Sequence, residues 1–326
     1  MRAVLCTEYG SHEKLILDDV ADPAPAPGQV LIDVHAASLN FPDLLVIRGE
    51  YQFKPEPPFV PGTEAAGVIV ALGEGVSGLS VGRRVTSVGV VGAFAPLRVV
   101  DESAAIPIPD EIGFETAASM TMAYGTSYHA LVQRGRLASG ETLLVLGAAG
   151  GVGSAAIEIG KVLGATVIAA ASSDEKLEFC RSIGADHTID YITEDLKSRV
   201  MEITGSDGAD VIYDPVGGDF AESAFRAIAW NGRYLVVGFT AGDIPRLPLN
   251  LPLLKGASII GVFWGSFTAR EPHTAAANLT EISRLIVGGE LKPPITETFP
   301  LERVIDAYEL LASRRAMGKI VLRVDR

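Results

Sequence analysis

The segment Gly147-Ala148-Ala149-Gly150-Gly151-Val152-Gly153 has the residue types and spacing that most clearly suggest chemistry. It follows a continuously apolar run, Thr142–Leu146, and precedes a stretch with helical spacing of apolar residues. In this setting the first glycine permits a tight turn, Gly150 lets the backbone approach a pyrophosphate, and Gly153 lets helix and strand pack closely. The amide groups of the helix N-terminus then face the phosphates. The segment therefore predicts a dinucleotide site formed by Gly150, Gly151 and Val152.

The end of the next predicted strand, Thr166–Ala171, indicates which dinucleotide binds. Enzymes that use NAD place an acidic residue there to bind the ribose 2′-hydroxyl. Here Ser172 and Ser173 follow the strand, and Asp174 falls in the first helical turn, where a carboxylate favours the helix dipole. Two hydroxyls and Lys176 suit a 2′-phosphate, so we expect NADP. Ser172 and Glu175 also have the spacing of a capping box. In the alternative, the serines therefore only cap the following helix, with Ser172 as the first capping residue, and Lys176 is solvated.

The elements that must position these residues alternate between strands and helices. Further apolar strand runs occur at Ala209–Tyr213, Gly232–Val237 and Ser258–Val262. This alternation predicts a doubly wound α/β domain over residues 121–264. Residues 1–120 contain short strands separated by Gly and Pro turns, which predicts a β-rich, barrel-like domain. Residues 265–326 are too few for a domain and are expected to complete the first one.

Composition excludes several classes of protein. A chain of 326 residues is long enough for two domains. Its 27 basic and 40 acidic residues give a net charge of −13 without a basic run, which argues against nucleic-acid binding. Uncharged stretches fall short of the roughly 20 apolar residues of a membrane span, and the N-terminus lacks a signal peptide's apolar core. We therefore expect a cytoplasmic protein. With only Cys6 and Cys180, it cannot have a disulfide framework.

Five segments occur in an order that resembles one family over essentially the whole length. They are Asn40–Tyr51 (NFPDLLVIRGEY), Pro61–Gly67 (PGTEAAG), Gly125–Leu131 (GTSYHAL), Gly147–Gly153 and Gly318–Leu322 (GKIVL). The chain resembles the zinc-independent medium-chain dehydrogenases/reductases, within them the quinone oxidoreductase (zeta-crystallin-like) family. The resemblance implies an N-terminal GroES-like β-barrel catalytic domain and a Rossmann domain. It also implies NADPH-dependent reduction of quinones or activated alkenes, and a homodimer.

Zinc-dependent relatives carry a GHE motif and a cysteine-rich loop. Here the corresponding position reads Gly62-Thr63-Glu64, neither cysteine is near it, and the five histidines show no ligand spacing. We therefore expect no metal. Without a Lewis acid to bind an alkoxide, reduction of an already polarised acceptor fits better than alcohol oxidation.

The resemblance also implies residues for the chemistry. Asn40 and Asp43 match the motif that lines the nicotinamide and substrate cleft, with Asn40 donating through its amide and Asp43 orienting its neighbours. Gly49-Glu50-Tyr51 matches the glycine–x–tyrosine step of enoyl-thioester reductases, in which the tyrosine donates a proton. Many quinone reductases carry another tyrosine about six residues earlier, where this chain has Leu44-Leu45-Val46. This departure shifts the expected role to Tyr51, with packing at the cleft as its alternative.

Other positions are expected to contact the cofactor. Gly238 and Phe239 follow a predicted strand whose carboxyl end should meet the nicotinamide. The resemblance implies Thr126 near the nicotinamide ribose or phosphate and Tyr191 near the 2′-phosphate and adenosine. The remaining candidates are Phe263, Trp264 and Lys319, the aromatic pair being equally compatible with core or dimer interface.

The leading function is hydride transfer from NADPH to a quinone or enone, with Tyr51 or water supplying the proton. One alternative is an acryloyl- or enoyl-CoA reductase, in which Arg48 or Lys54 contacts CoA phosphates. The other is a nucleotide-bound structural or RNA-binding protein that has lost turnover, since a fold does not determine a function.

Overall fold

The computed structural model describes residues 1–324, which form two compact units. The first comprises Met1–Met122 together with residues 293–324, and the second comprises Ala123–Lys292. Within the described residues, no helix combines the length and apolar character that crossing a membrane requires.

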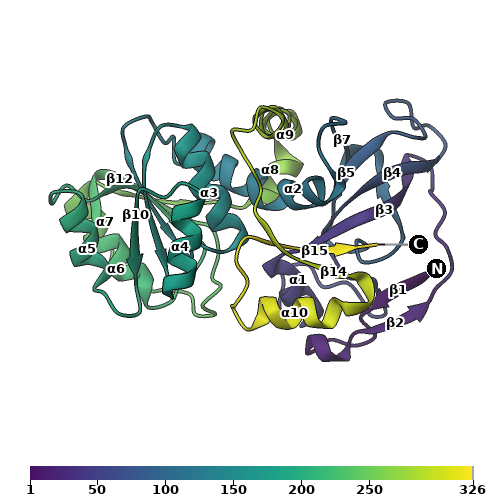
Figure 1. The fold of residues 1–326 in the computed structure, drawn as a ribbon, viewed down its shortest axis with the longest axis horizontal. Helices are drawn as coiled ribbons and strands as arrows, with labels where there is room; N and C mark the ends of the chain where they lie inside the picture. Colours follow the sequence, from purple (N-terminus) through teal and green to yellow (C-terminus); the bar gives the residue numbers. More distant parts are fainter. Residues whose placement is uncertain (325–326) are drawn as a thin grey trace. The chain divides into compact units, whose positions relative to one another are not determined.

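The second unit is built on a six-stranded parallel sheet with the order β10-β9-β8-β11-β12-β13. Its strands are β8 (Thr142–Leu146), β9 (Thr166–Ala171), β10 (His187–Asp190), β11 (Ala209–Asp214), β12 (Ile228–Val236) and β13 (Ser258–Gly261). Its helices in the strand–helix alternation are α3 (Gly151–Val162), α4 (Asp174–Ser182), α5 (Leu196–Ile203), α6 (Phe220–Arg226) and α7 (Asn250–Lys255). Helices α3 and α4 lie on one face of the sheet, and α5 and α6 on the other (Figure 1). Because both faces are covered, the inner strands are continuously apolar, as in Leu143–Leu146.

The first unit contains a seven-stranded sheet with the order β14-β15-β3-β4-β5-β7, and β6 also pairs with β3. Its strands are β3 (Gln29–Leu39), β4 (Glu64–Leu72), β5 (Arg84–Val88), β6 (Leu97–Asp101), β7 (Ala105–Pro107), β14 (Ile295–Pro300) and β15 (Lys319–Arg323). A separate antiparallel pair is formed by β1 (Arg2–Leu5) and β2 (Ile16–Asp19). The late strand β15 pairs antiparallel with β3, so the C-terminal part of the chain completes this unit.

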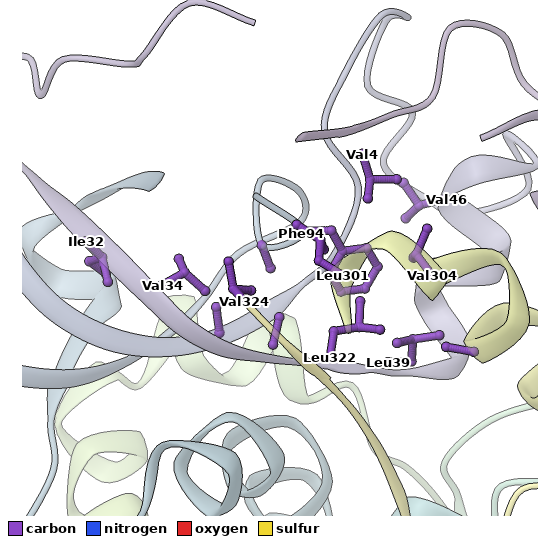
Figure 2. Close-up of a cluster of buried hydrophobic side chains, with 14 of the residues drawn as sticks. Val4, Ile32, Val34, Leu39, Val46, Phe94, Leu301, Val304, Leu322 and Val324 are labelled. Carbon is purple, nitrogen blue, oxygen red and sulfur yellow. The ribbon is translucent and has the colours of Figure 1, made fainter. Parts of the chain in front are cut away.

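The core of the first unit joins side chains from both ends of the sequence. Val30, Ile32 and Val34 alternate along β3 and are buried, which is the period of a strand with one face toward the core. They share one apolar cluster with Val304 and Leu322, and Figure 2 shows members of this cluster from several elements. Helices α1 (Phe41–Ile47) and α10 (Val304–Ala312) contact each other in this unit.

Helices also occur outside the strand–helix alternation of the second unit. Helix α2 spans Phe114–Tyr128 and continues as a π-helical turn over His129–Arg134. Helices α8 (Trp264–Arg270) and α9 (Pro272–Val287) follow β13.

Residues 265–292 group with the second unit, whereas the sequence pattern placed the return to the first unit at residue 265. The reason is side-chain packing. The ring of Phe267 in α8 stacks on His129 at 3.7 Å between centroids, and Asn278 in α9 exchanges hydrogen bonds of 2.8 and 3.1 Å with Gln133. These contacts hold α8 and α9 against the π-helical turn, so both helices belong to the second unit.

Candidate functional site

The glycine-rich segment forms the turn between β8 and α3, and each glycine has a distinct geometric role. Gly147 has a φ of +55°, which favours glycine. A Cβ on Gly153 would lie 2.4 Å from the carbonyl oxygen of Gly147, so only glycine fits there. A Cβ on Gly150, the N-cap of α3, would meet protein only at 3.4 Å. The helix N-terminus therefore has an open backbone approach at Gly150, with Gly151 and Val152 in its first turn.

Ser172 and Lys176 are brought together at the carboxyl end of β9. The ammonium of Lys176 donates to Ser172 Oγ at 3.0 Å, while Ser173 Oγ accepts from the Lys176 backbone amide at 3.4 Å and caps α4. The expectation that the helix cap begins at Ser172 is therefore wrong by one residue, because Ser173 has the extended N-cap backbone. Tyr191 follows β10, its amide donating to the Ala171 carbonyl at 3.2 Å and its ring 4.4 Å from Phe220. Ser172, Lys176 and Tyr191 thus all lie at the carboxyl end of β9.

The remaining candidates of the second unit separate into exposed and buried residues. Gly238 follows β12, with its amide 3.3 Å from the Asp214 carbonyl, and the neighbouring Phe239 is partly exposed. Phe263 is exposed, but Trp264 is buried, and a Cβ on Gly125 would lie 2.9 Å from its indole. Trp264 is thus a packing residue against α2, while the partly buried Thr126 lies next to that contact.

In the first unit, a buried polar network joins Asn40, Lys319 and Glu64. Lys319 donates to the Asn40 side-chain oxygen at 2.6 Å, and its ammonium lies 3.7 Å from Glu64 Oε2. The Asn40 side-chain nitrogen donates to that same carboxylate oxygen at 3.2 Å and to Thr63 Oγ1 at 3.3 Å. Lys319 is 2% exposed and Glu64 is fully buried. Asn40 and Lys319, both candidates from the sequence, therefore meet, and the Asn40 amide donates within this network.

Glu64 and Arg98 were not among the candidate residues, although both are buried and charged. Glu64 accepts from Ser38 Oγ at 3.0 Å and, through its other oxygen, from the Met122 amide at 3.0 Å. Arg98 donates to the carbonyls of Thr63 and Val91, each at 3.1 Å. A signal was available for each: Glu64 begins an apolar strand, and alternation places Arg98 on the same face of β6 as the buried Val100.

Asp43 lies in the first turn of α1 and is 1% exposed. Its Oδ2 accepts from the Asn40 amide at 2.7 Å, which forms a capping box. Burial raises the pKa of Asp43 to about 7, against the opposing effects of the Asn40 amide and the Lys319 charge. The half-buried Tyr51 has a pKa raised by burial and by the charge of Asp43, so its phenol keeps its proton at neutral pH.

Asp43→Asn is expected to remove a pH dependence of stability. The folded pKa of about 7 lies above the ordinary value of 3.8, so between about pH 5 and 7 the folded protein retains a proton that the unfolded chain has released. The contribution of Asp43 to the free energy of unfolding therefore falls as pH rises, by about 1.4 kcal/mol per pH unit, and levels off above the folded pKa. Urea denaturation across this range should show wild type losing roughly 2–3 kcal/mol relative to Asp43→Asn. Parallel stability profiles would contradict the raised pKa.

Two family models match the chain. The alcohol dehydrogenase GroES-like domain matches residues 26–110, and the zinc-binding dehydrogenase model matches residues 151–281. The residues here do not fit a zinc ion. Glu64 accepts hydrogen bonds from the hydroxyl of Ser38 and the amide of Asn40, and it forms an ion pair with the ammonium of Lys319. Among residues 1–324, no group of three or more His, Cys, Asp or Glu side chains could hold a metal.

Similar proteins cover the whole chain. The quinone oxidoreductase-like protein 2 homolog of Nematostella vectensis is 39% identical, over 98% of this chain and 88% of that protein. The human quinone oxidoreductase is 33% identical, over 99% of this chain and 97% of that protein. The crystal structure of the Escherichia coli quinone oxidoreductase complexed with NADPH has a TM-score of 0.90 at 28% identity, covering 99% of this chain and 100% of that one. The predicted combination of a GroES-like and a Rossmann domain is confirmed, and this chain belongs to the quinone oxidoreductase family of the medium-chain dehydrogenases/reductases.

Proposed function

We propose that this protein transfers hydride from NADPH to a quinone or to an activated alkene such as an enone. The observation that carries the proposal is the turn from Gly147 to Gly153, where a Cβ on Gly153 would meet the backbone but Gly150 remains open. Gly150, Gly151 and Val152 would hold the pyrophosphate, and the pair of Ser172 and Lys176 would hold the 2′-phosphate. The bound nicotinamide supplies the hydride. The NADPH complex of the Escherichia coli relative supports this choice of cofactor.

Residues of the first unit would donate the proton that the reduced product needs and would hold the donor's surroundings in place. Hydride addition to a conjugated carbonyl leaves an enolate or hydroquinone anion, which requires a proton and is stabilised by hydrogen-bond donors. Tyr51 retains its phenolic proton at neutral pH and is the proposed donor. Asn40 and Lys319 act as positioning residues, because their hydrogen bonds hold the start of α1, where Asp43 lies.

The test is steady-state NADPH oxidation with a panel of quinones, enones and enoyl-CoA thioesters. Turnover of quinones or enones supports the proposal. Turnover of enoyl-CoA alone would favour the thioester reductase, for which the exposed Arg48 and Lys54 offer charges to the CoA phosphates. NADPH binding without turnover of any acceptor would favour a non-catalytic nucleotide-binding protein.

Tyr51→Phe is expected to lower kcat for NADPH oxidation by about 100-fold, the lower part of the range for general acids, because water can also supply the proton. The KM for NADPH should stay unchanged. Tyr308→Phe is the matched control, since within the described chain the buried hydroxyl of Tyr308 has no hydrogen-bond partner. A Tyr51→Phe protein with the wild-type kcat would remove Tyr51 from the mechanism.

Lys176→Ala is expected to weaken NADPH binding about tenfold and to leave NADH binding unchanged, because only NADPH carries the 2′-phosphate that this ammonium would contact. Equilibrium titration of both cofactors measures this. Lys197→Ala, at an exposed lysine on α5, controls for the loss of one positive charge. Equal weakening of both cofactors, or equal wild-type affinity for them, would argue against the NADP assignment.

We also propose that two copies of the chain form a homodimer through the edge of the parallel sheet. Strand β13 is the last strand of the sheet, and a sheet edge presents unpaired backbone groups. Large apolar side chains are exposed on it and in the preceding segment around α7, including Leu253 and Leu249 at 78% and 80% and Ile259 on the strand itself. Exposed apolar groups of this kind favour association. Sedimentation velocity tests the dimer, and a single species at the 34.3 kDa of one chain would contradict it.

A further inference from the structure

The strand β11 ends at the point where the order of the parallel sheet reverses. Strands β8 and β11 are neighbours, the chain runs from β8 outward through β9 and β10, and it runs from β11 outward through β12 and β13. In open α/β sheets, ligands bind outside the carboxyl ends of the strands at such a point. Asp214 is the last residue of β11, and Tyr213 precedes it. Neither residue is in the glycine-rich turn or among the candidate contacts, so their buried polar groups need another explanation.

Asp214 is 3% exposed and holds the backbone that leaves β11. One carboxylate oxygen accepts from the amides of Val216 at 2.7 Å and Gly217 at 2.9 Å. The other oxygen accepts from the hydroxyl of Tyr234, which is buried in β12. A buried carboxylate with three donors is a satisfied group, and it determines the path of the next three residues.

The loop held by Asp214 contacts the glycine-rich turn. A Cβ on Gly147 would lie 2.8 Å from a methyl group of Val216, so the Val216 side chain rests directly against this glycine. The amide that places Val216 is the one bonded to Asp214. A shift of the loop would therefore reach the first glycine of the phosphate-binding turn.

The same loop also holds the segment after β12. The carbonyls of Pro215 and Val216 accept from the amides of Thr240 at 3.1 Å and Ala241 at 2.9 Å. A Cβ on Gly217, whose φ is +67°, would lie 2.9 Å from the ring of Phe239. The loop that Asp214 holds is thus bonded to the segment containing Phe239, a candidate contact from the sequence.

Tyr213 is linked through Ser127 to Val152, the residue that precedes the last glycine of the turn. Ser127 Oγ donates to the Val152 carbonyl at 2.8 Å and lies 2.8 Å from the Tyr213 hydroxyl. Since the serine has one proton, which it gives to Val152, the Tyr213 hydroxyl donates to Ser127. The side chains of Tyr213 and Ser127 are both fully buried, and Val152 lies in the first turn of α3. Adjacent residues of one strand are therefore linked to the glycine-rich turn at two positions, Gly147 and Val152.

We propose that Asp214, held by Tyr234, is a positioning residue that sets the glycine-rich turn and the 237–241 segment in the geometry that binds NADPH. Tyr213 supports the same turn through Ser127. This inference rests on the proposed function, because it assigns these residues to the same cofactor site. None of them needs to touch the cofactor: they act by fixing backbone that does.

The experiment compares NADPH dissociation constants for Tyr234→Phe, Asp214→Ala and Asp214→Asn. Tyr234→Phe removes one donor to the carboxylate and should raise the dissociation constant about tenfold or more. Asp214→Ala should raise it further. Asp214→Asn keeps an oxygen for the Val216 and Gly217 amides and should restore most of the affinity. Thermal unfolding is measured on every variant.

Tyr124→Phe is the matched control, since Tyr124 also donates to a buried carboxylate of the second unit, that of Glu158. It should lower thermal stability like Tyr234→Phe without changing NADPH affinity. Wild-type affinity in Tyr234→Phe and Asp214→Ala, or equal weakening in Tyr124→Phe, would overturn the inference. A wild-type protein that fails to bind NADPH would instead overturn the proposed function, so the two failures are distinguishable.

Discussion

Gly153→Val is expected to abolish NADPH binding, raising the dissociation constant by at least about 100-fold, and to destabilise the second unit. The added Cβ would lie 2.4 Å from the Gly147 carbonyl oxygen and 2.8 Å from the Ala148 Cα, which are backbone atoms that cannot give way locally. The turn between β8 and α3 must therefore open, and the amides of the helix N-terminus leave their positions. Equilibrium titration with NADPH and thermal unfolding measure the two effects.

Gly150→Ala separates the cofactor effect from the folding effect. Its Cβ would meet only the Gly147 carbonyl oxygen at 3.4 Å, and its φ of −75° suits alanine. The cofactor-free protein should keep its thermal stability. NADPH affinity should nevertheless fall, because the methyl group occupies the space through which the backbone approaches the pyrophosphate. Unchanged NADPH affinity in Gly150→Ala would mean that the pyrophosphate does not bind at this turn.

Lys319→Met is expected to lower the free energy of unfolding of the first unit by about 3–5 kcal/mol. The substitution leaves Glu64 fully buried and without its cation, and it removes the 2.6 Å hydrogen bond to Asn40. An uncompensated buried charge is the costly outcome, whereas the intact pair adds little by itself. Urea denaturation followed by fluorescence measures the change.

Two further variants make this expectation specific. Lys319→Met combined with Glu64→Gln should recover part of the lost stability, because the unpaired negative charge is gone. Lys161→Met breaks a shorter ion pair of 2.7 Å with Asp186, in which both side chains are 36% exposed, and should cost no more than about 1 kcal/mol. If Lys319→Met lowers the free energy of unfolding no more than Lys161→Met does, then Glu64 does not need Lys319 to offset its buried charge.

Much of the second unit could be predicted because its signals are local. Strands β8 and β9 lie at the predicted residues, since strands covered on both faces are continuously apolar. The glycine spacing likewise reflects contacts within a few residues, such as that between Gly153 and the Gly147 carbonyl. The neighbouring cap was misplaced because two adjacent serines can each cap a helix, and only the backbone conformation of Ser173 decides between them.

The polar network of the first unit could be predicted only in part. Asn40 and Lys319 were candidates from the resemblance, but they lie 279 positions apart and meet because β15 pairs with β3. The sequence gives a weaker indication that Glu64 is buried, namely one carboxylate at the start of an apolar strand. Asp214 and Tyr234 carried none, because a tyrosine and an aspartate in different strands look like ordinary strand residues until the pairing of β11 with β12 joins them.

The amino-acid sequence by itself determined the parallel α/β unit and its glycine-rich turn, because apolar periodicity and short-range backbone geometry express these directly. The family followed from the resemblance of five ordered segments, from Asn40–Tyr51 to Gly318–Leu322. Tertiary structure alone decided which charged groups are buried together, which unit residues 265–292 join, and which side chains hold the loops at the end of β11. Such contacts join residues far apart in the chain, and their energies depend on burial and pairing, which no local pattern of residue types records.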